Sequence, residues 1–97
     1  MRRIRKVTLE SMSENGHFEY NPRGVCSSKI EFDLADGRVR NLKFKGGCNG
    51  NLKAIGLLSE GMEAEELIQK LSGNTCGFRK TSCADQFAKA LEAARNA

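Results

Sequence analysis

Alternating apolar and polar residues predict β-structure in the first half of the chain. Residues 29–34 alternate most regularly, so that their apolar members share one face and their charged members share the other. The apolar face consists of Ile30, Phe32 and Leu34. A shorter alternation at residues 17–20 predicts another strand, which ends at Asn21-Pro22.

A tight turn and a bulge are expected in the hairpin that follows. Asp36-Gly37 is a strong signal for a two-residue hairpin turn. In the return run, residues 38–45, the apolar phase slips by one residue between Val39 and Leu42. That slip indicates an extra residue, and hence a β-bulge, near Arg40-Asn41. The three strands should form one antiparallel sheet.

The apolar period then changes to that of helices, which predicts three helices at residues 51–60, 63–71 and 82–95. In the third helix, Ser82 is the expected N-cap, and Asp85 three residues later gives an acidic variant of the capping box. The expected inward faces are Leu52, Ile55 and Leu58 in the first helix, Leu67, Ile68 and Leu71 in the second, and Phe87, Leu91 and Ala94 in the third.

Strands followed by helices are typical of an α+β fold, here a three-stranded antiparallel sheet with about three helices packed on one face. The 97 residues suffice for a single small domain. We place this domain at residues 17–97, after a basic N-terminal lead-in at residues 1–16.

Net charge and hydropathy limit the expected partners and cellular location of the protein. The net charge of +4 permits an anionic partner, but four of the 16 Lys and Arg residues lie in the first six positions. The remaining chain is closer to neutral, so we do not expect nucleic acid as the partner. No apolar stretch has the length of a signal-peptide core or of a membrane span, so we expect a cytoplasmic protein without membrane contact.

Four cysteines carry the candidate chemistry: Cys26, Cys48, Cys76 and Cys83. All four lie at the ends of expected elements, and in a reducing compartment clustered thiols are typical of metal or redox sites. Cys48 lies in a glycine-rich turn before the first helix, and Cys83 follows the expected cap of the third. Because helix N-termini favour anions, both sulfurs should favour the thiolate form. Four thiolate ligands suit zinc or an iron–sulfur centre.

Other interpretations of these residues stay open. The cysteines could be small buried residues without chemistry, or Cys76 and Cys83 could form a redox dithiol. The glycine turn gives a weaker signal for anion or nucleotide binding, with Gly46, Gly47, Asn49 and Arg79 as its candidate residues. The single histidine, His17, is more typical of a structural residue than of a ligand.

Four blocks of sequence resemble the TSCPD-domain proteins. They are residues 24–27, 44–52, 61–62 and 76–86, the last of which contains Thr81-Ser82-Cys83-Ala84-Asp85. Ala84 stands where the name-giving motif has proline. The family also occurs as the C-terminal domain of cobalamin-dependent ribonucleoside-diphosphate reductases, so the resemblance implies a link to deoxyribonucleotide synthesis. Radical reduction needs a large barrel, a cobalamin site and a nucleotide pocket, which 97 residues cannot enclose.

A more distant similarity is to U-type iron–sulfur scaffold proteins, over residues 37–58. The resemblance implies that Cys26, Cys48 and Cys83 correspond to the scaffold cysteines, with Cys76 as an additional thiol. Where the scaffolds have Cys-Gly-Asp, this chain has Cys26-Ser27-Ser28.

Taken together, these patterns predict a metal-binding accessory module that uses zinc or an iron–sulfur centre and acts with a protein partner. The expected partner is a reductase or a cluster-handling protein. The alternatives are a redox module that serves a reductase and a module that binds a nucleotide. No residue of the chain is assigned a catalytic role.

Overall fold

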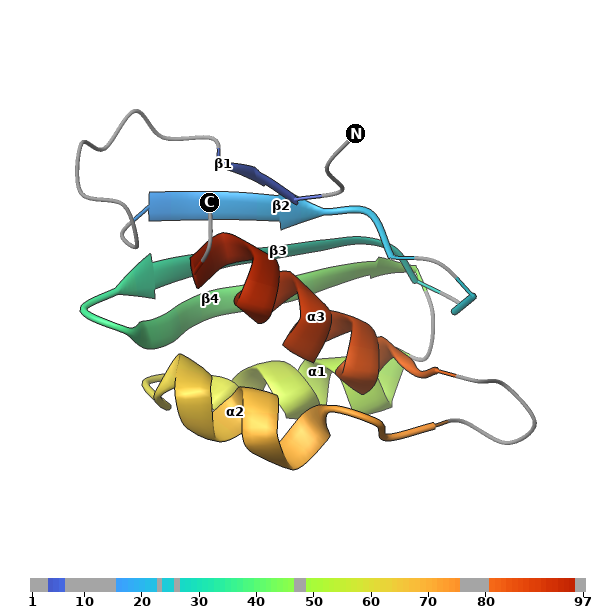
Figure 1. The fold of residues 1–97 in the computed structure, drawn as a ribbon. Helices are drawn as coiled ribbons and strands as arrows, with labels where there is room; N and C mark the ends of the chain where they lie inside the picture. Colours follow the sequence, from blue (N-terminus) through green and yellow to red (C-terminus); the bar gives the residue numbers. More distant parts are fainter. Residues whose placement is uncertain are drawn as a thin grey trace.

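A computed structural model describes residues 4–6, 16–22, 24–25, 27–46, 49–75 and 81–95. Within these residues four strands form one antiparallel sheet in sequence order, and three helices follow them (Figure 1). The elements are β1 (Ile4–Lys6), β2 (Gly16–Tyr20), β3 (Ser27–Ala35), β4 (Arg38–Gly46), α1 (Asn49–Ser59), α2 (Ala64–Leu71) and α3 (Cys83–Arg95). The α+β class predicted from the sequence is confirmed.

The hairpin between β3 and β4 has the predicted turn and the predicted bulge. Asp36 and Gly37 have φ values of 53° and 79°, as a two-residue type I′ turn requires. Glu31 pairs with Lys43 and Asp33 pairs with Arg40, so a single residue of β3 faces two residues of β4. One of those two, Asn41, has a φ of 55°, and this left-handed conformation accommodates the extra residue.

Strand β1 extends the sheet beyond the three predicted strands. Ile4 pairs with Tyr20 of β2, and both side chains are buried. Residues 4–6 belong to the expected basic lead-in at residues 1–16. Their pairing with β2 adds a short fourth strand to the β2–β3–β4 sheet.

The core lies between one face of the sheet and the helices. Phe18 and Phe32 stack across β2 and β3 with ring centroids 5.7 Å apart, and Phe87 of α3 meets Phe32 edge-on at 5.8 Å. Leu91 and Ala94 of α3 and Leu67 and Ile68 of α2 complete the same buried cluster. Helix α3 crosses in front of the strands in Figure 1. The predicted inward face of α3 is confirmed.

In helix α1, one residue of the predicted inward face is wrong. Leu58, expected to point inward, is 75% exposed, whereas Ser59 is 2% exposed. Leu52 and Ser59 are buried in this helix, and a Cβ atom on Gly56 would lie 3.0 Å from the carbonyl oxygen of Leu42 in β4. Because glycine permits this close approach, the contact face is rotated and Leu58 turns toward solvent.

The link between α1 and α2 is tied to the start of β4. The Gly61 amide donates to the Val39 carbonyl at 2.7 Å, and the Val39 amide donates to the Met62 carbonyl at 2.9 Å. The Ala64 amide donates to the Gly37 carbonyl at 2.8 Å. These bonds fix the beginning of α2 beside the hairpin turn. In the described part of the chain, no helix combines the length and the apolar character that crossing a bilayer requires.

Candidate thiolate site at the start of helix α3

Cys83 occupies the first position of α3, directly after the N-cap. The Ser82 hydroxyl oxygen accepts a hydrogen bond from the Asp85 amide at 3.1 Å, which is the bond expected of a helix N-cap. The Cys83 side chain is half-buried and is not in a disulfide. Its predicted place at a helix N-terminus is confirmed.

Ser82 also ties the start of α3 to the segment that leaves α2. Its hydroxyl donates to the Asn74 carbonyl at 2.6 Å, and the Asn74 amide group donates back to the hydroxyl at 3.4 Å. Asn74 and Ser82 are therefore held together, although residues 75–81 lie between them in the chain.

The Asp85 side chain also links the start of α3 to the segment after α2, through hydrogen bonds that the capping-box prediction missed. Its carboxylate accepts hydrogen bonds from the Gly73 amide, at 2.7 Å, and from the Thr81 hydroxyl. Burial alone would raise the pKa of Asp85, but these two bonds and the nearby Lys89 ammonium outweigh burial and lower it. The capping box predicted that the Asp85 side chain forms a hydrogen bond at the start of α3. Its partners are Gly73 and Thr81 rather than the backbone N–H of the N-cap residue.

The start of β3 and the end of β4 also lie next to the start of α3. The Ser27 hydroxyl oxygen lies 3.3 Å from the Cys83 sulfur, and Ser27 is buried. Ser27 is also the register partner of Gly46, the last residue of β4. A Cβ atom on Gly24 would lie 3.3 Å from the Thr81 methyl carbon. Strands β3 and β4 and helix α3 therefore converge at Cys83.

Cys83 is the one predicted metal ligand that the structure describes. Cys26, Cys48 and Cys76 lie outside the described residues, so their placement stays a prediction. The same holds for Gly47 and Arg79 of the predicted anion site. The other two members are described: Gly46 ends β4 with a φ of 76°, and Asn49 begins α1. Gly46 also lines a groove of about 400 Å³ between β4 and α1, whose lining includes Lys43 and Lys53.

Sequence reasoning did not identify a second cluster of polar side chains, on the outer face of β2 and β3. His17 Nδ1 lies 2.5 Å from an Asp33 carboxylate oxygen, and His17 Nε2 lies 3.4 Å from a Glu31 oxygen. The hydrogen bond that His17 donates to Asp33 raises the pKa of His17. Burial opposes this increase in part, and the charges of both carboxylates and the Glu31 hydrogen bond add to it. Alternation predicted that Glu31 and Asp33 share a face of one strand, but only the cross-strand register brings His17 into contact with them.

Comparison with known proteins identifies the family of the chain. Searches of the curated proteins and of the solved structures found no match. The family model described as the TSCPD domain matches residues 5–95, which is nearly the whole chain. The matched region contains the Ser27–Cys83 junction and all the helices described above. The chain therefore belongs to the TSCPD domain family.

Proposed function

We propose that this TSCPD domain is an accessory module that binds a metal through the thiolates of Cys26, Cys48, Cys76 and Cys83. The bound group would be a zinc ion or an iron–sulfur centre, since both accept ligation by sulfur alone. In keeping with the family resemblance, the module would serve ribonucleoside-diphosphate reduction or the handling of clusters, beside a protein partner.

The observation that carries this proposal is the convergence of described residues that flank the cysteines. Ser27, which follows Cys26, contacts the sulfur of Cys83. Gly46, two residues before Cys48, is the register partner of Ser27. Consecutive Cα atoms are about 3.8 Å apart, and the sequence separates Cys26 from Ser27 by one residue step and Cys48 from Gly46 by two.

The same reasoning applies to Cys76. Asn74 is hydrogen-bonded to Ser82, the residue before Cys83. Cys76 is two residues from Asn74, and two residues span at most about 7 Å. These short spacings are compatible with a tetrahedral site that draws its ligands from separate loops.

The chemistry around Cys83 suits a thiolate ligand. The sulfur lies at a helix N-terminus, where unpaired backbone N–H groups and the helix dipole favour negative charge. The Ser27 hydroxyl can donate a hydrogen bond to this sulfur, as residues behind a metal ligand commonly do. When bound, zinc would cross-link the ends of β3, β4 and α3, and its binding free energy would add to folding free energy.

Metal analysis of anaerobically purified protein tests the proposal. We expect about one zinc or one iron–sulfur centre per chain, and four thiols that resist alkylation until a chelator is added. Each of the four Cys→Ser variants should lose metal, whereas Ser28→Ala, which changes an exposed hydroxyl bonded to the Lys45 carbonyl, should retain it. Metal-free protein, or four thiols that are alkylated equally fast with and without chelator, would refute the proposal.

The Asn74–Ser82 contact also supports the redox alternative. It closes the chain between Cys76 and Cys83 into a short loop, which would favour a dithiol pair. This alternative predicts metal-free protein in which Cys76 and Cys83 titrate together as a reversible two-electron couple. Cys26→Ser and Cys48→Ser would then leave the couple intact, which separates the two proposals.

A further inference from the structure

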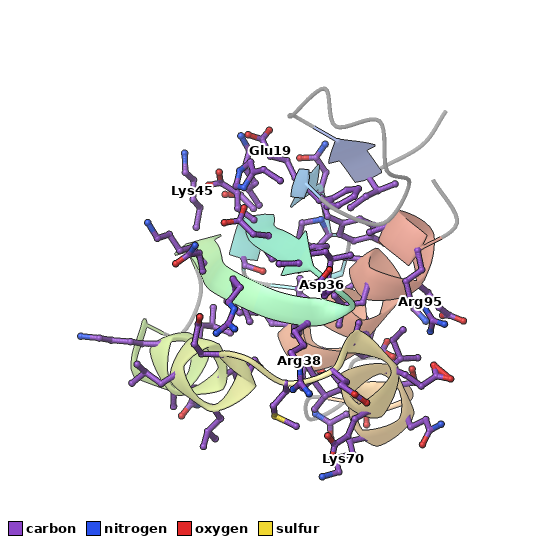
Figure 2. The ribbon with its side chains drawn as sticks, turned by 90° about the vertical axis from the view of Figure 1, so that its left-hand side faces the viewer. Glu19, Asp36, Arg38, Lys45, Lys70 and Arg95 are labelled. Atoms are coloured by element: carbon purple, nitrogen blue, oxygen red, sulfur yellow. The ribbon has the colours of Figure 1, made fainter. Side chains whose placement is uncertain are left out.

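The outer face of the sheet brings together three side chains that can ligate a metal. Glu19 and Glu31 are directly opposite each other on β2 and β3, and His17 lies opposite Asp33 in the same strand pair. One ligand atom each from His17, Glu19 and Glu31 can be chosen such that all three lie within 4.8 Å of one another. Figure 2 shows Glu19 on the side of the sheet away from α3.

The register places two carboxylates and their cationic neighbours close together on this face. Like charges directly opposite each other across a strand pair destabilise a sheet, and Glu19 and Glu31 are such a pair. Lys29 lies 3.4 Å from Glu19 and offsets this repulsion, and Arg5 of β1 is the register partner of Glu19 on its other side. Glu31 has the imidazole of His17 as its neighbour, at 3.4 Å.

Asp33 determines which nitrogen of His17 faces the two glutamates. A carboxylate only accepts hydrogen bonds, so the Nδ1–H of His17 donates to Asp33 at 2.5 Å. Nε2 is then directed toward Glu31 and can carry either a proton or a metal ion. A carboxylate that orients a histidine through its other nitrogen is a recurrent arrangement behind metal-bound histidines.

We propose that His17 Nε2 and the carboxylates of Glu19 and Glu31 form a site for a divalent transition-metal ion such as Mn²⁺ or Zn²⁺, with Asp33 as a positioning residue. One imidazole with two carboxylates favours these ions over Mg²⁺ and Ca²⁺, which prefer oxygen ligands alone. All three ligands are half-buried, so water can complete the coordination. None of the three ligands is a cysteine, so this site does not depend on the proposed thiolate function.

The single histidine allows a direct test with Mn²⁺, an ion that thiolates bind poorly. Manganese is paramagnetic and broadens the NMR signals of nearby nuclei. At a pH above the pKa of His17, titration of the whole protein with Mn²⁺ should broaden its imidazole signals before other side-chain signals. Glu19→Gln and Glu31→Gln should each require at least about tenfold more Mn²⁺, a loss typical of a weakened metal site. The control Glu66→Gln, on the exposed face of α2, should behave as the wild type.

Asp33→Asn tests the positioning role with a second readout. Nitrogen chemical shifts of the imidazole should show a loss of the Nδ1–H preference, together with about 10–100-fold weaker Mn²⁺ binding. Amide spectra of each metal-free variant check that the sheet is retained. Equal Mn²⁺ dependence in the wild type and both glutamate variants would overturn the proposal. So would wild-type protein whose imidazole signals do not broaden, a result that needs no variant to fold.

Discussion

The Ser27 hydroxyl oxygen and the Cys83 sulfur lie 3.3 Å apart, although the two residues are 56 positions apart in the sequence. This contact joins the start of β3 to the start of α3. It also gives Cys83 a buried polar neighbour, since Ser27 is 4% exposed. Ser27 can therefore influence the metal affinity of the Cys83 sulfur without being a ligand itself.

Ser27→Ala should weaken metal binding at the thiolate site without removing it. Loss of a hydrogen bond behind a ligand typically costs about 10–100-fold in metal affinity. Competition with a chromophoric chelator measures this change, and Ser28→Ala is the matched control because its hydroxyl faces solvent and the Lys45 carbonyl. Identical affinities in the wild type and Ser27→Ala would show that the hydroxyl has no influence on the site.

Asp85→Asn should lower the free energy of unfolding near neutral pH and make it less sensitive to acid. Hydrogen bonds to a charged group contribute about 1.5–3 kcal/mol, and Asp85 accepts two, from Gly73 and Thr81. Since folding lowers the pKa of Asp85 below its ordinary value of 3.8, its stabilisation is present above that pH and is lost as pH falls through the folded-state pKa. Urea denaturation of both proteins from neutral to acidic pH measures the difference. A constant difference across that range would contradict the assignment.

Two glycines of α1 should respond oppositely to alanine. Gly56→Ala would place a Cβ atom 3.0 Å from the Leu42 carbonyl oxygen and push α1 from β4, which should cost about 1 kcal/mol or more. Among the described residues, no atom lies within 4 Å of such a Cβ at Gly50, so Gly50→Ala should stabilise the helix by about 0.5–1 kcal/mol. Thermal unfolding of the two variants provides the comparison. Similar shifts in Tm for both would show that α1 does not depend on close approach at Gly56.

The two leucines that the sequence grouped together should also differ. Leu52 is 7% exposed, and Leu52→Ala should cost about 2–5 kcal/mol because it leaves a cavity against β4. Leu58 is 75% exposed, and Leu58→Ala should change stability by less than about 0.5 kcal/mol. Chemical denaturation measures both free energies. A large loss in Leu58→Ala would mean that its side chain is covered in solution.

Local features of the fold were predictable from the sequence because their causes are local. The Asp36-Gly37 turn follows from the positive φ angles that these residue types tolerate. The bulge follows from a phase slip that is visible along β4 itself. Ser82 caps α3 because a hydroxyl can reach a backbone N–H three residues later.

Features that depend on partners distant in sequence were missed or wrong. Leu58 has the spacing of a core residue, but the close approach at Gly56 sets the rotation of α1 against β4. The Asp85 carboxylate finds the Gly73 amide because α2 and α3 pack together. His17 meets Asp33 only through the register of β2 and β3. Neither the packing nor the register can be derived from periodicity.

X-ray absorption at the metal edge of anaerobically purified protein tests the convergence of the four thiols most directly. Four converging thiolates predict a first shell of sulfur atoms at about 2.3 Å for zinc, or the sulfur shell of an iron–sulfur centre. A first shell made only of nitrogen and oxygen atoms would contradict it, and would instead point to His17, Glu19 and Glu31 as the ligands of the bound metal.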